Sequence, residues 1–271
     1  MPRARTEQHT ADSNQPMILQ QLREYAAGLA HDRTIADVRI GLCYTAVLLD
    51  DGSAGVAYTF KECLPPGCDV FQGKRPVAGK TASETLAYLS SPDLLERAVG
   101  LATANALLNH SREELVAGDI LDVLACGADD RVGMVGYFPP LMPVLKPKVR
   151  ELLVFENILK TGPGIFSEDK AYNLLPSCTV AIITATSILN NTLPGLLEAC
   201  HNCRAIAIVG ATTPLAPEVF QPKGVTLLSG IVVTNSLGII RQVSEGGGMG
   251  SFKGYIEKVN LPLITRQKTG D

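Results

Sequence analysis

Five near-continuous apolar runs in the second half of the chain constrain its fold more than any other feature. The runs are RVGMVGYF, ELLVFEN, TVAIITA, RAIAIVGA and VTLLSGIVV. Strands buried on both faces of a parallel sheet show such uninterrupted runs, whereas half-exposed strands alternate apolar and polar residues. Helical patterns separate or follow the runs, namely EDKAYNLL, TLPGLLEAC, PLAPEVF and TNSLGIIRQVSE. We therefore predict an α/β fold in which residues 128–271 form a Rossmann-like, mostly parallel open sheet.

The first half of the chain follows a different pattern. A helical stretch, ILQQLREYAAGLA, precedes two alternating stretches, CYTAVLLD and GVAYTF, which DGSAG joins as a hairpin. Two further helical patterns follow, SETLAYL and DLLERAVGLATANALLNH, and Pro92 and Asp93 supply the start signal of the second. Strands that precede helices indicate an α+β domain over residues 17–127, after a polar tail at residues 1–16. Two domains also fit the length of 271 residues.

The composition argues against nucleic-acid and membrane partners. The formal net charge is −3, divided into −5 for residues 1–127 and +2 for the remainder. Neither half has the basic excess of a nucleic-acid-binding domain. No apolar run reaches the roughly 18 residues of a membrane span, and the N-terminus lacks the apolar middle of a signal peptide. We expect a cytoplasmic protein with a small-molecule partner, and the sequence leaves a homo-oligomer open.

The seven cysteines lie mostly in apolar or strand-like stretches, where a free thiol behaves as a small hydrophobic residue. The one suggestive spacing is Cys200-His-Asn-Cys203. It follows the helical pattern TLPGLLEAC, and a helix C-terminus does not stabilise a thiolate as the N-terminal position of a redox motif does. A zinc site needs four ligands, and Cys63 and Cys68 form no convincing second pair beside His201. We favour a loop between a helix and the next strand over a metal site.

Polar residues follow each predicted strand at its carboxyl end, where ligands of open α/β sheets bind. The segments are Gly136-Tyr-Phe-Pro-Pro, Glu156-Asn157, Thr184-Ala-Thr-Ser, Gly210-Ala-Thr-Thr-Pro and Val233-Thr-Asn-Ser, with Asn190-Asn-Thr close behind the third. Helix capping explains many of them, because Thr213 before Pro214 is an expected N-cap and Thr234 or Asn235 is another. We expect the pair of Thr212 and Thr213 to cap a helix and also to line a cleft for an anionic or oxygen-rich ligand.

Two glycine-rich stretches lack the motifs of nucleotide-binding loops. The stretch VGMVGYF contains G-x-x-G and not the three-glycine turn that holds a dinucleotide, so NAD binding is disfavoured. Residues 244–254, SEGGGMGSFKG, fit no register of G-x-x-x-x-G-K-[ST]. We interpret this segment as a helix C-cap that continues into a flexible loop, with a lid over the cleft as the alternative.

Several longer motifs are similar to those of one known family. They are GLCYTAVLLDDGSAGVAYTF in the first half, and VFENILKTGPG, AIITATSILNNTLPGLLEAC, AIVGATTPLAP and GIVVTNS in the second. Over residues 17–262 the chain resembles the putative heavy-metal chelation proteins, bacterial and archaeal proteins in which an enolase-N-terminal-like domain is joined to a Rossmann-like domain. The resemblance implies this architecture for residues 17–127 and 128–271, and a ligand site at the junction of the two domains.

The resemblance also implies which residues would bind the ligand. They come from the strand ends and from the first domain: Phe138, Pro139, Asn157, Thr186, Asn190, Gly210, Thr212, Thr213 and Asn235, with Tyr44, Thr45 and Asn105. The pattern of strand ends reaches the residues of the second domain independently. Glu156 is the candidate catalytic residue, because it is the one carboxylate at the predicted edge. A metal ion or a metal chelate is the implied cofactor.

Three functions remain open. The first is binding of a small oxygen-rich or metal-bearing molecule between the domains. Hydroxyls, amides and one carboxylate suit a hard cation and not a soft heavy metal, so we expect a heavy metal to arrive already held by an organic chelator. The second is an enzyme that uses Glu156 as acid or base, although no titratable partner is visible. The third is a nucleotide or S-adenosylmethionine binder in which Asn157 or Glu156 contacts a ribose.

Overall fold

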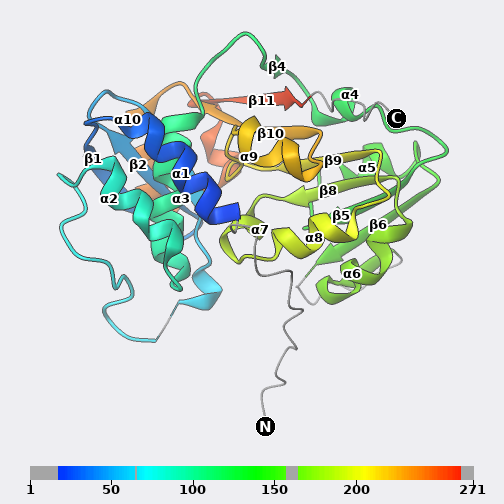
Figure 1. The fold of residues 1–271 in the computed structure, drawn as a ribbon, viewed down its shortest axis with the longest axis horizontal. Helices are drawn as coiled ribbons and strands as arrows, with labels where there is room; N and C mark the ends of the chain where they lie inside the picture. Colours follow the sequence, from blue (N-terminus) through cyan, green and yellow to red (C-terminus); the bar gives the residue numbers. More distant parts are fainter. Residues whose placement is uncertain (1–17, 65, 157–163, 264–271) are drawn as a thin grey trace, which may run out of the picture.

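The protein is described by a computed structural model that covers residues 18–64, 66–156 and 164–263. Its strands form a small and a large sheet, which lie side by side (Figure 1). The small sheet is antiparallel, in the order β1 (Ile35–Ile40), β2 (Tyr44–Leu49) and β3 (Ala54–Tyr58). The predicted hairpin of the first half is therefore confirmed as β2 and β3.

The large sheet has eight strands within the described residues. In spatial order they are β4 (Val116–Ala117), β11 (Ile256–Pro262), β10 (Leu227–Val233), β9 (Ala205–Val209), β8 (Val180–Thr184), β5 (Arg131–Val135), β6 (Glu151–Glu156) and β7 (Ile165–Ser167). The six strands from β10 to β7 are parallel to one another, whereas β11 is antiparallel to β10 and to β4. The predicted α/β fold with a mostly parallel sheet is confirmed. The likeness of the two parts to enolase-N-terminal and Rossmann domains stays a prediction.

The five apolar runs form parallel strands because helices cover both faces of the large sheet. The helices that pack on this sheet or connect its strands are α4 (Ile120–Leu124), α5 (Met142–Leu145), α6 (Ala171–Leu174), α7 (Thr186–Leu189), α8 (Leu193–Ala199) and α9 (Pro217–Phe220). Val135, Ile183 and Ile208 pack in one buried cluster with residues of α6 to α9, whereas Met134 and Ile182 pack in another with residues of α4 and α5. Alternate residues of one strand are thus buried on opposite faces.

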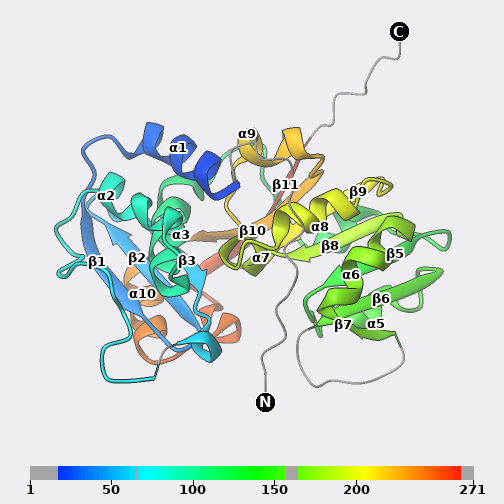
Figure 2. The ribbon, with the colours of Figure 1, turned by 60° about the horizontal axis from the view of Figure 1, so that its bottom comes forward.

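Helices from both halves of the chain cover the small sheet. On one face lie α1 (Ile18–Ala30), α2 (Ala82–Leu86) and α3 (Leu94–Leu108). On the other face α10 (Ser236–Ser244) contacts β1 and β2, and its apolar side chains pack with Ala46 and Val56. Figure 2 shows α10 on the opposite side of β2 from α1. The second half of the chain therefore completes the core around the small sheet, and β4 carries a segment before residue 128 into the large sheet. The division between residues 127 and 128 stays a prediction.

Six short 3-10 helices complete the secondary structure of the described residues: η1 (Lys61–Cys63), η2 (Ala87–Ser90), η3 (Glu168–Lys170), η4 (Leu175–Ser177), η5 (Gln221–Lys223) and η6 (Met249–Phe252). The start signal predicted for the helix that follows Asp93 is confirmed, since Asp93 caps α3, and the sequence analysis did not predict the capping box that Thr81 forms with Glu84 at α2. No helix in this part of the chain is long and apolar enough to pass through a bilayer.

One predicted helix start is wrong. The helix expected from Pro214 onward begins only at Pro217, with Ala216 as its N-cap residue, so Thr213 does not cap it. The Thr213 hydroxyl instead donates a hydrogen bond to the carbonyl of Ser229 in β10, at 3.0 Å. A threonine before a proline is compatible with extended backbone as well as with a cap, and the contact with β10 favours the extended form here.

Helix α3 packs unusually close to β3 at Gly55. A Cβ atom built on Gly55 would lie 2.2 Å from the amide nitrogen of Ala106 and 2.3 Å from the carbonyl oxygen of Ala102. These are backbone atoms in the middle of a helix, which cannot move aside as a flexible side chain can. Only glycine at this position allows the helix to approach the sheet so closely.

Candidate functional site

The order of the parallel strands reverses between β5 and β8. The chain runs outward from β5 through β6 to β7, then returns to β8 beside β5 and runs the other way through β9 to β10. Such a reversal is a topological switch point, and open α/β sheets bind ligands outside the carboxyl ends of the strands at this place. We call the edge at which β5, β6, β8 and β9 end the carboxyl edge, and the opposite one the amino edge.

The backbones at the switch point come close together. Gly136, directly after β5, has a φ of +93°, and a Cβ atom there would lie 3.0 Å from the Cβ atom of Thr184 and 3.5 Å from the ring of Phe138. Glycine is needed both for the left-handed conformation and for the approach to β8. Across the switch point the hydroxyl oxygens of Thr184 and Thr186 lie 3.0 Å apart, and both side chains are half-buried. This pair presents hydroxyl groups at the place where β8 ends.

Two carboxylates lie at the same edge. Glu156 ends β6 and pairs in register with Ser167 of β7, which places Glu168 beside it in the next residue of the chain. Burial of Glu168 and, second, the negative charge of Glu156 raise the pKa of the Glu168 carboxyl above its ordinary value. The sequence analysis missed Glu168 because it missed the three-residue strand β7. The edge therefore has the second titratable carboxyl that the sequence did not reveal.

The small sheet contributes aromatic side chains to this region. The pKa of Tyr58, at the end of β3, is raised first by burial and then by nearby acidic groups, Glu156 among them. Tyr58 therefore lies within electrostatic range of the end of β6, although it belongs to the other sheet. Tyr44 and Phe60 pack edge-to-face on Tyr58, with ring centroids 6.0 and 5.1 Å away. Burial raises the pKa of Tyr44 to about 12, so this phenol stays protonated and can donate a hydrogen bond.

Four of the predicted binding residues are buried, and their polar groups bond inside the protein. The Thr212 hydroxyl accepts a hydrogen bond from the Tyr58 amide at 3.0 Å, and the Asn105 side-chain nitrogen donates to the Thr212 carbonyl at 3.1 Å. Thr45 pairs its hydroxyl with that of Thr59, and Thr213 bonds to β10. Thr212 and Asn105 thus hold the segment after β9 against β3 and α3, and a direct role of the four residues in ligand binding stays a prediction. Within the described residues, the side-chain oxygen of Asn105 is buried without a hydrogen-bond partner.

A residue of this contact that the sequence analysis missed is Asn109. Its side-chain nitrogen donates to the Thr213 carbonyl at 3.0 Å, and its oxygen accepts from the Leu215 amide at 2.9 Å. Asn105 and Asn109 are four residues apart on α3 and its C-cap, so both face the segment that follows β9. No local sequence pattern connects residues that are more than a hundred positions apart, which is why only the structure identifies this contact.

The remaining predicted residues lie at different places. Gly210, with a φ of +122°, ends β9 beside open space. Asn190 accepts a hydrogen bond from the Thr192 hydroxyl at 2.8 Å, and Pro139 is exposed after β5. Asn235 is exposed and caps α10 through the Gly238 amide, which confirms the predicted cap. Asn157 lies outside the described residues. For each of these, binding of a ligand stays a prediction.

The glycine-rich segment at residues 244–254 begins with the expected C-cap of α10 at Glu245, but its residues 249–252 form η6, and the flexibility of the segment stays a prediction. Its residue Phe252 is fully buried, and its ring centroid lies 5.1 Å from that of Tyr44. The segment is therefore anchored against the small sheet near the aromatic side chains of β2 and β3. The alternative of a lid over the cleft stays a prediction.

The side chains named at the ends of β5, β6 and β8 offer oxygen donors, and the thiols of Cys43 and Cys63 lie within electrostatic range of Tyr58 in the small sheet. Hydroxyl, phenol and carboxylate groups suit hard cations, whereas soft heavy metals prefer thiolate and imidazole ligands. Across the parts of the chain that the structure describes, no three or more His, Cys, Asp or Glu side chains are grouped so that they could hold a metal ion. A bare heavy-metal ion therefore does not fit the residues at this edge.

Two cavities lie away from the switch point. One, of about 290 Å³, is lined by α1, α9 and η5, including Tyr25, Glu218 and Lys223. The other, of about 370 Å³, lies between β1 and the loop that contains Arg75 and Pro76. Neither cavity lies at the switch point, so the cleft expected there stays a prediction.

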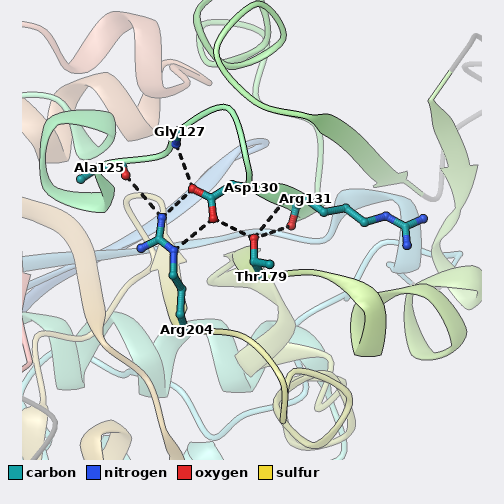
Figure 3. A network of polar contacts seen from close by, with 6 residues as sticks. All are labelled: Ala125, Gly127, Asp130, Arg131, Thr179 and Arg204. Atoms are coloured by element: carbon teal, nitrogen blue, oxygen red, sulfur yellow. Dashed lines mark hydrogen bonds and ion pairs between the residues drawn. The ribbon is translucent and has the colours of Figure 1, made fainter.

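A polar network at the amino edge ties three strands together. The Asp130 carboxylate, just before β5, accepts hydrogen bonds from the Arg204 guanidinium, the Thr179 hydroxyl and the Gly127 amide (Figure 3). Thr179 immediately precedes β8, and Arg204 immediately precedes β9. Every acceptor oxygen of Asp130 is engaged by the protein itself, so the network is structural.

The fold and the switch point define a two-sheet α/β protein in which the small sheet adjoins the carboxyl ends of the large one. Comparison with known proteins gives the family. The chain belongs to the family described as putative heavy-metal chelation, whose two models match residues 119–262 and 22–108. The resemblance inferred from the sequence motifs is thereby confirmed.

The relatives match this chain along nearly their whole length. An uncharacterized protein of Methanocaldococcus jannaschii is 25% identical over 262 residues, which are 91% of this chain and 98% of that protein. A crystal structure of a protein with unknown function from Pyrococcus horikoshii has a TM-score of 0.81 and 27% identity, covering 91% of this chain and 100% of that one. A second crystal structure, of a protein with unknown function from Desulfitobacterium hafniense, has a TM-score of 0.75 and 24% identity. It covers 90% of this chain and 98% of that one, and it supports the fold alone.

Proposed function

We propose that the protein binds a small oxygen-rich molecule, free or carrying a metal ion, where the carboxyl edge of the large sheet adjoins the small sheet. The observation that carries this proposal is the switch point between β5 and β8, with Gly136 and the hydroxyls of Thr184 and Thr186 directly outside it. Glu156 from the next strand and Tyr58 from the small sheet extend the same polar region. Both sheets thus contribute side chains to one place, as a binding site between two units requires.

The oxygen donors at this edge support a ligand that brings its own chelating groups. Threonine hydroxyls and a tyrosine phenol can donate hydrogen bonds to carboxylate or carbonyl oxygens of an organic ligand. A metal ion held by such a ligand keeps its preferred donors and meets only the outer carboxylates of Glu156 and Glu168. This arrangement is compatible with the family description, because no three or more His, Cys, Asp or Glu side chains of the described residues are grouped so that they could hold a bare metal ion.

Substitution of Thr186 and Glu156 tests this function. Native mass spectrometry of the protein as purified would detect a bound molecule, and calorimetric titration with citrate and with nickel citrate would probe the site directly. Thr186→Val should weaken either complex by about 10-fold, the value of one lost hydrogen bond. Glu156→Gln should weaken the binding of nickel citrate and should not weaken the binding of free citrate, because the carboxylate attracts the metal ion and repels the free anion.

The matched control is Glu257→Gln, which makes the same charge change at an exposed position of strand β11. This variant should bind citrate and nickel citrate with the same affinities as the wild type. Equal affinities in all three variants, or a bound mass that survives Thr186→Val and Glu156→Gln together, would place the ligand elsewhere on the protein.

A second candidate function is acid-base catalysis at the same edge. The specific observation in its favour is Glu168, a partly buried carboxyl whose pKa is raised and which lies near a second carboxylate. A carboxyl that is protonated closer to neutral pH is suited to act as a general acid while its neighbour stays ionised. Glu168 would then be the acid and Glu156 the base or the charge that tunes it.

The electrostatic coupling of the two carboxylates is open to direct measurement. Glu156→Gln should lower the pKa of Glu168 part of the way toward its ordinary value, since burial, the larger cause, remains. Carboxyl carbon chemical shifts followed by NMR between pH 3 and pH 8 would give this pKa in the wild type and in the variant. Glu257→Gln should leave it unchanged, and an unshifted Glu168 in Glu156→Gln would remove the support for a catalytic pair.

A further inference from the structure

The cavity of about 290 Å³ lies between α1 and the segment that α9 and η5 form. Helix α1 belongs to the first half of the chain and α9 to the second, and the two helices lie side by side (Figure 2). Gln21, Glu24 and Tyr25 of α1 line the cavity together with Glu218 of α9 and Lys223 of η5. Its volume is at the lower end of the range for small-molecule sites, so it suits a small metabolite.

The local structure of two elements brings these polar side chains to one space. Gln21, Glu24 and Tyr25 follow one another at intervals that place them on one face of a helix. Lys223 is the last residue of η5, and Gly224, with a φ of +83°, ends this element in the left-handed conformation. The polar face of α1 and the end of η5 therefore meet at the cavity, although they lie about two hundred residues apart in the chain.

Polar groups of this lining lack partners within the described residues. The side-chain oxygen of Gln21 is buried without a hydrogen-bond partner. A buried acceptor without a donor is costly, so a ligand that donates to it is favoured. Lys223 is half-buried, and no ion pair of the described residues involves Lys223, Glu24 or Glu218. Opposite charges thus line one cavity without contacting each other.

Tyr25 adds a neutral hydrogen-bond donor to the lining. Burial, the largest cause, and then a hydrogen bond to Glu218 raise the pKa of Tyr25 to about 12. The phenol therefore stays protonated at neutral pH and can hold the Glu218 carboxylate in place. Burial also lowers the pKa of Lys223, and an anionic group of a ligand would oppose this effect.

We propose that this cavity binds an amino acid that carries a second cationic group, of the class of L-lysine. Two carboxylates and one ammonium group line the cavity, and such a ligand offers the complementary set of two ammonium groups and one carboxylate. The ammonium groups of the ligand pair with Glu24 and Glu218, and one of them donates to the Gln21 oxygen. The carboxylate of the ligand pairs with Lys223, and the buried Val219 offers an apolar surface to its aliphatic chain. This site does not depend on the proposed function.

The test compares ligands that differ by one charged group. Full-length protein at low ionic strength, where exposed charges are least screened, is titrated calorimetrically with L-lysine, with cadaverine, which lacks the carboxylate, and with L-norleucine, which lacks the second ammonium group. L-lysine should bind at least about 10-fold more tightly than either analogue, the value of one hydrogen bond between charged groups. Lys223→Met should weaken L-lysine by about 10-fold and should not weaken cadaverine, because the Lys223 ammonium attracts a carboxylate and repels a dication. Glu218→Gln should weaken both.

Matched variants separate this site from general charge effects and from the carboxyl edge. Lys258→Met and Glu257→Gln make the same charge changes at exposed positions of β11, and they should bind all three ligands as the wild type does. Thr186→Val should also bind L-lysine with the affinity of the wild type. The comparison of ligands on the wild type needs no variant to fold. No saturable binding of L-lysine by the wild type, equal affinity for L-lysine and either analogue, an equal loss of L-lysine and cadaverine in Lys223→Met, or loss of L-lysine in Thr186→Val would each overturn the proposal.

Discussion

Asp130→Asn is expected to lower the free energy of unfolding by about 3 kcal/mol at neutral pH. The Asp130 side chain is 10% exposed and accepts from Arg204 at 3.0 and 2.6 Å, from the Gly127 amide at 2.9 Å and from the Thr179 hydroxyl at 2.8 Å. Removal of its charge leaves these donors with a weaker acceptor and places an amide against the guanidinium. Arg204 is 48% exposed, so water can solvate it, and the loss lies at the lower end of the range for broken buried pairs.

The loss should depend on pH with a definite sign. Hydrogen bonding from Arg204, the largest cause, lowers the pKa of Asp130 from 3.8 to about 2. A carboxyl whose pKa is lower in the folded state stabilises the fold above its unfolded pKa, and this contribution of about 2 kcal/mol disappears as the pH falls toward 2. Urea unfolding at pH 7 and pH 3 should therefore show the gap between wild type and Asp130→Asn shrinking by about 1 kcal/mol.

The control for this effect is Asp37→Asn in β1. Asp37 pairs with Arg39 at 2.8 Å, but their side chains are 30% and 50% exposed, and exposed pairs contribute about 0 to 1 kcal/mol. A gap for Asp130→Asn that is equal at both pH values, or no larger than that of Asp37→Asn, would show that the network does not stabilise the three strands as described.

Gly55→Ala is expected to destabilise the protein by about 3 kcal/mol, the upper end for overpacking a core. The added methyl group would overlap backbone atoms of Ala102 and Ala106, and relief requires α3 to move away from β3. That movement would also pull Asn105 and Asn109 from the segment after β9. Urea unfolding monitored by circular dichroism gives the change in the free energy of unfolding.

Gly28→Ala provides the opposite expectation from the same substitution. Gly28 is exposed in α1, and a Cβ atom there meets nothing within 4 Å. Alanine in a helix interior should stabilise the protein by about 0.5 to 1 kcal/mol. If Gly55→Ala lowered the free energy of unfolding by less than about 1 kcal/mol, α3 would not lie as close to β3 as described.

The sequence predicted the strands that are buried and missed those that are not. The runs at β5, β6, β8, β9 and β10 are apolar because both faces of these strands are covered, and this burial leaves a clear pattern. Strand β1 (IADVRI) lies at an edge of the small sheet and β11 (IEKVNLP) is half-exposed, so both carry charged residues. Strands β4 and β7 are two and three residues long and exist only through their pairing partners.

The sequence predicted the candidate site only where it also predicted the ends of the strands. Strand ends in the sequence indicated the carboxyl edge, and Gly136, Thr186 and Glu156 do lie there. The sequence could not distinguish hydroxyls that face solvent from those that are used inside the protein. Thr212 is one of the latter, because its partners Tyr58 and Asn105 belong to the other sheet. Glu168 was missed since its place beside Glu156 depends on the register of β7.

The position of α10 has a consequence for the order in which the chain can fold during synthesis. Ala46 and Val56 on one face of the small sheet are covered by Ile239, Ile240, Val243 and Phe252, which the ribosome adds almost two hundred residues later. Until then the nascent small sheet carries an uncovered apolar face while the entire parallel sheet is being made. Translation of this protein therefore passes through a long interval in which the apolar face of the first half is exposed to aggregation.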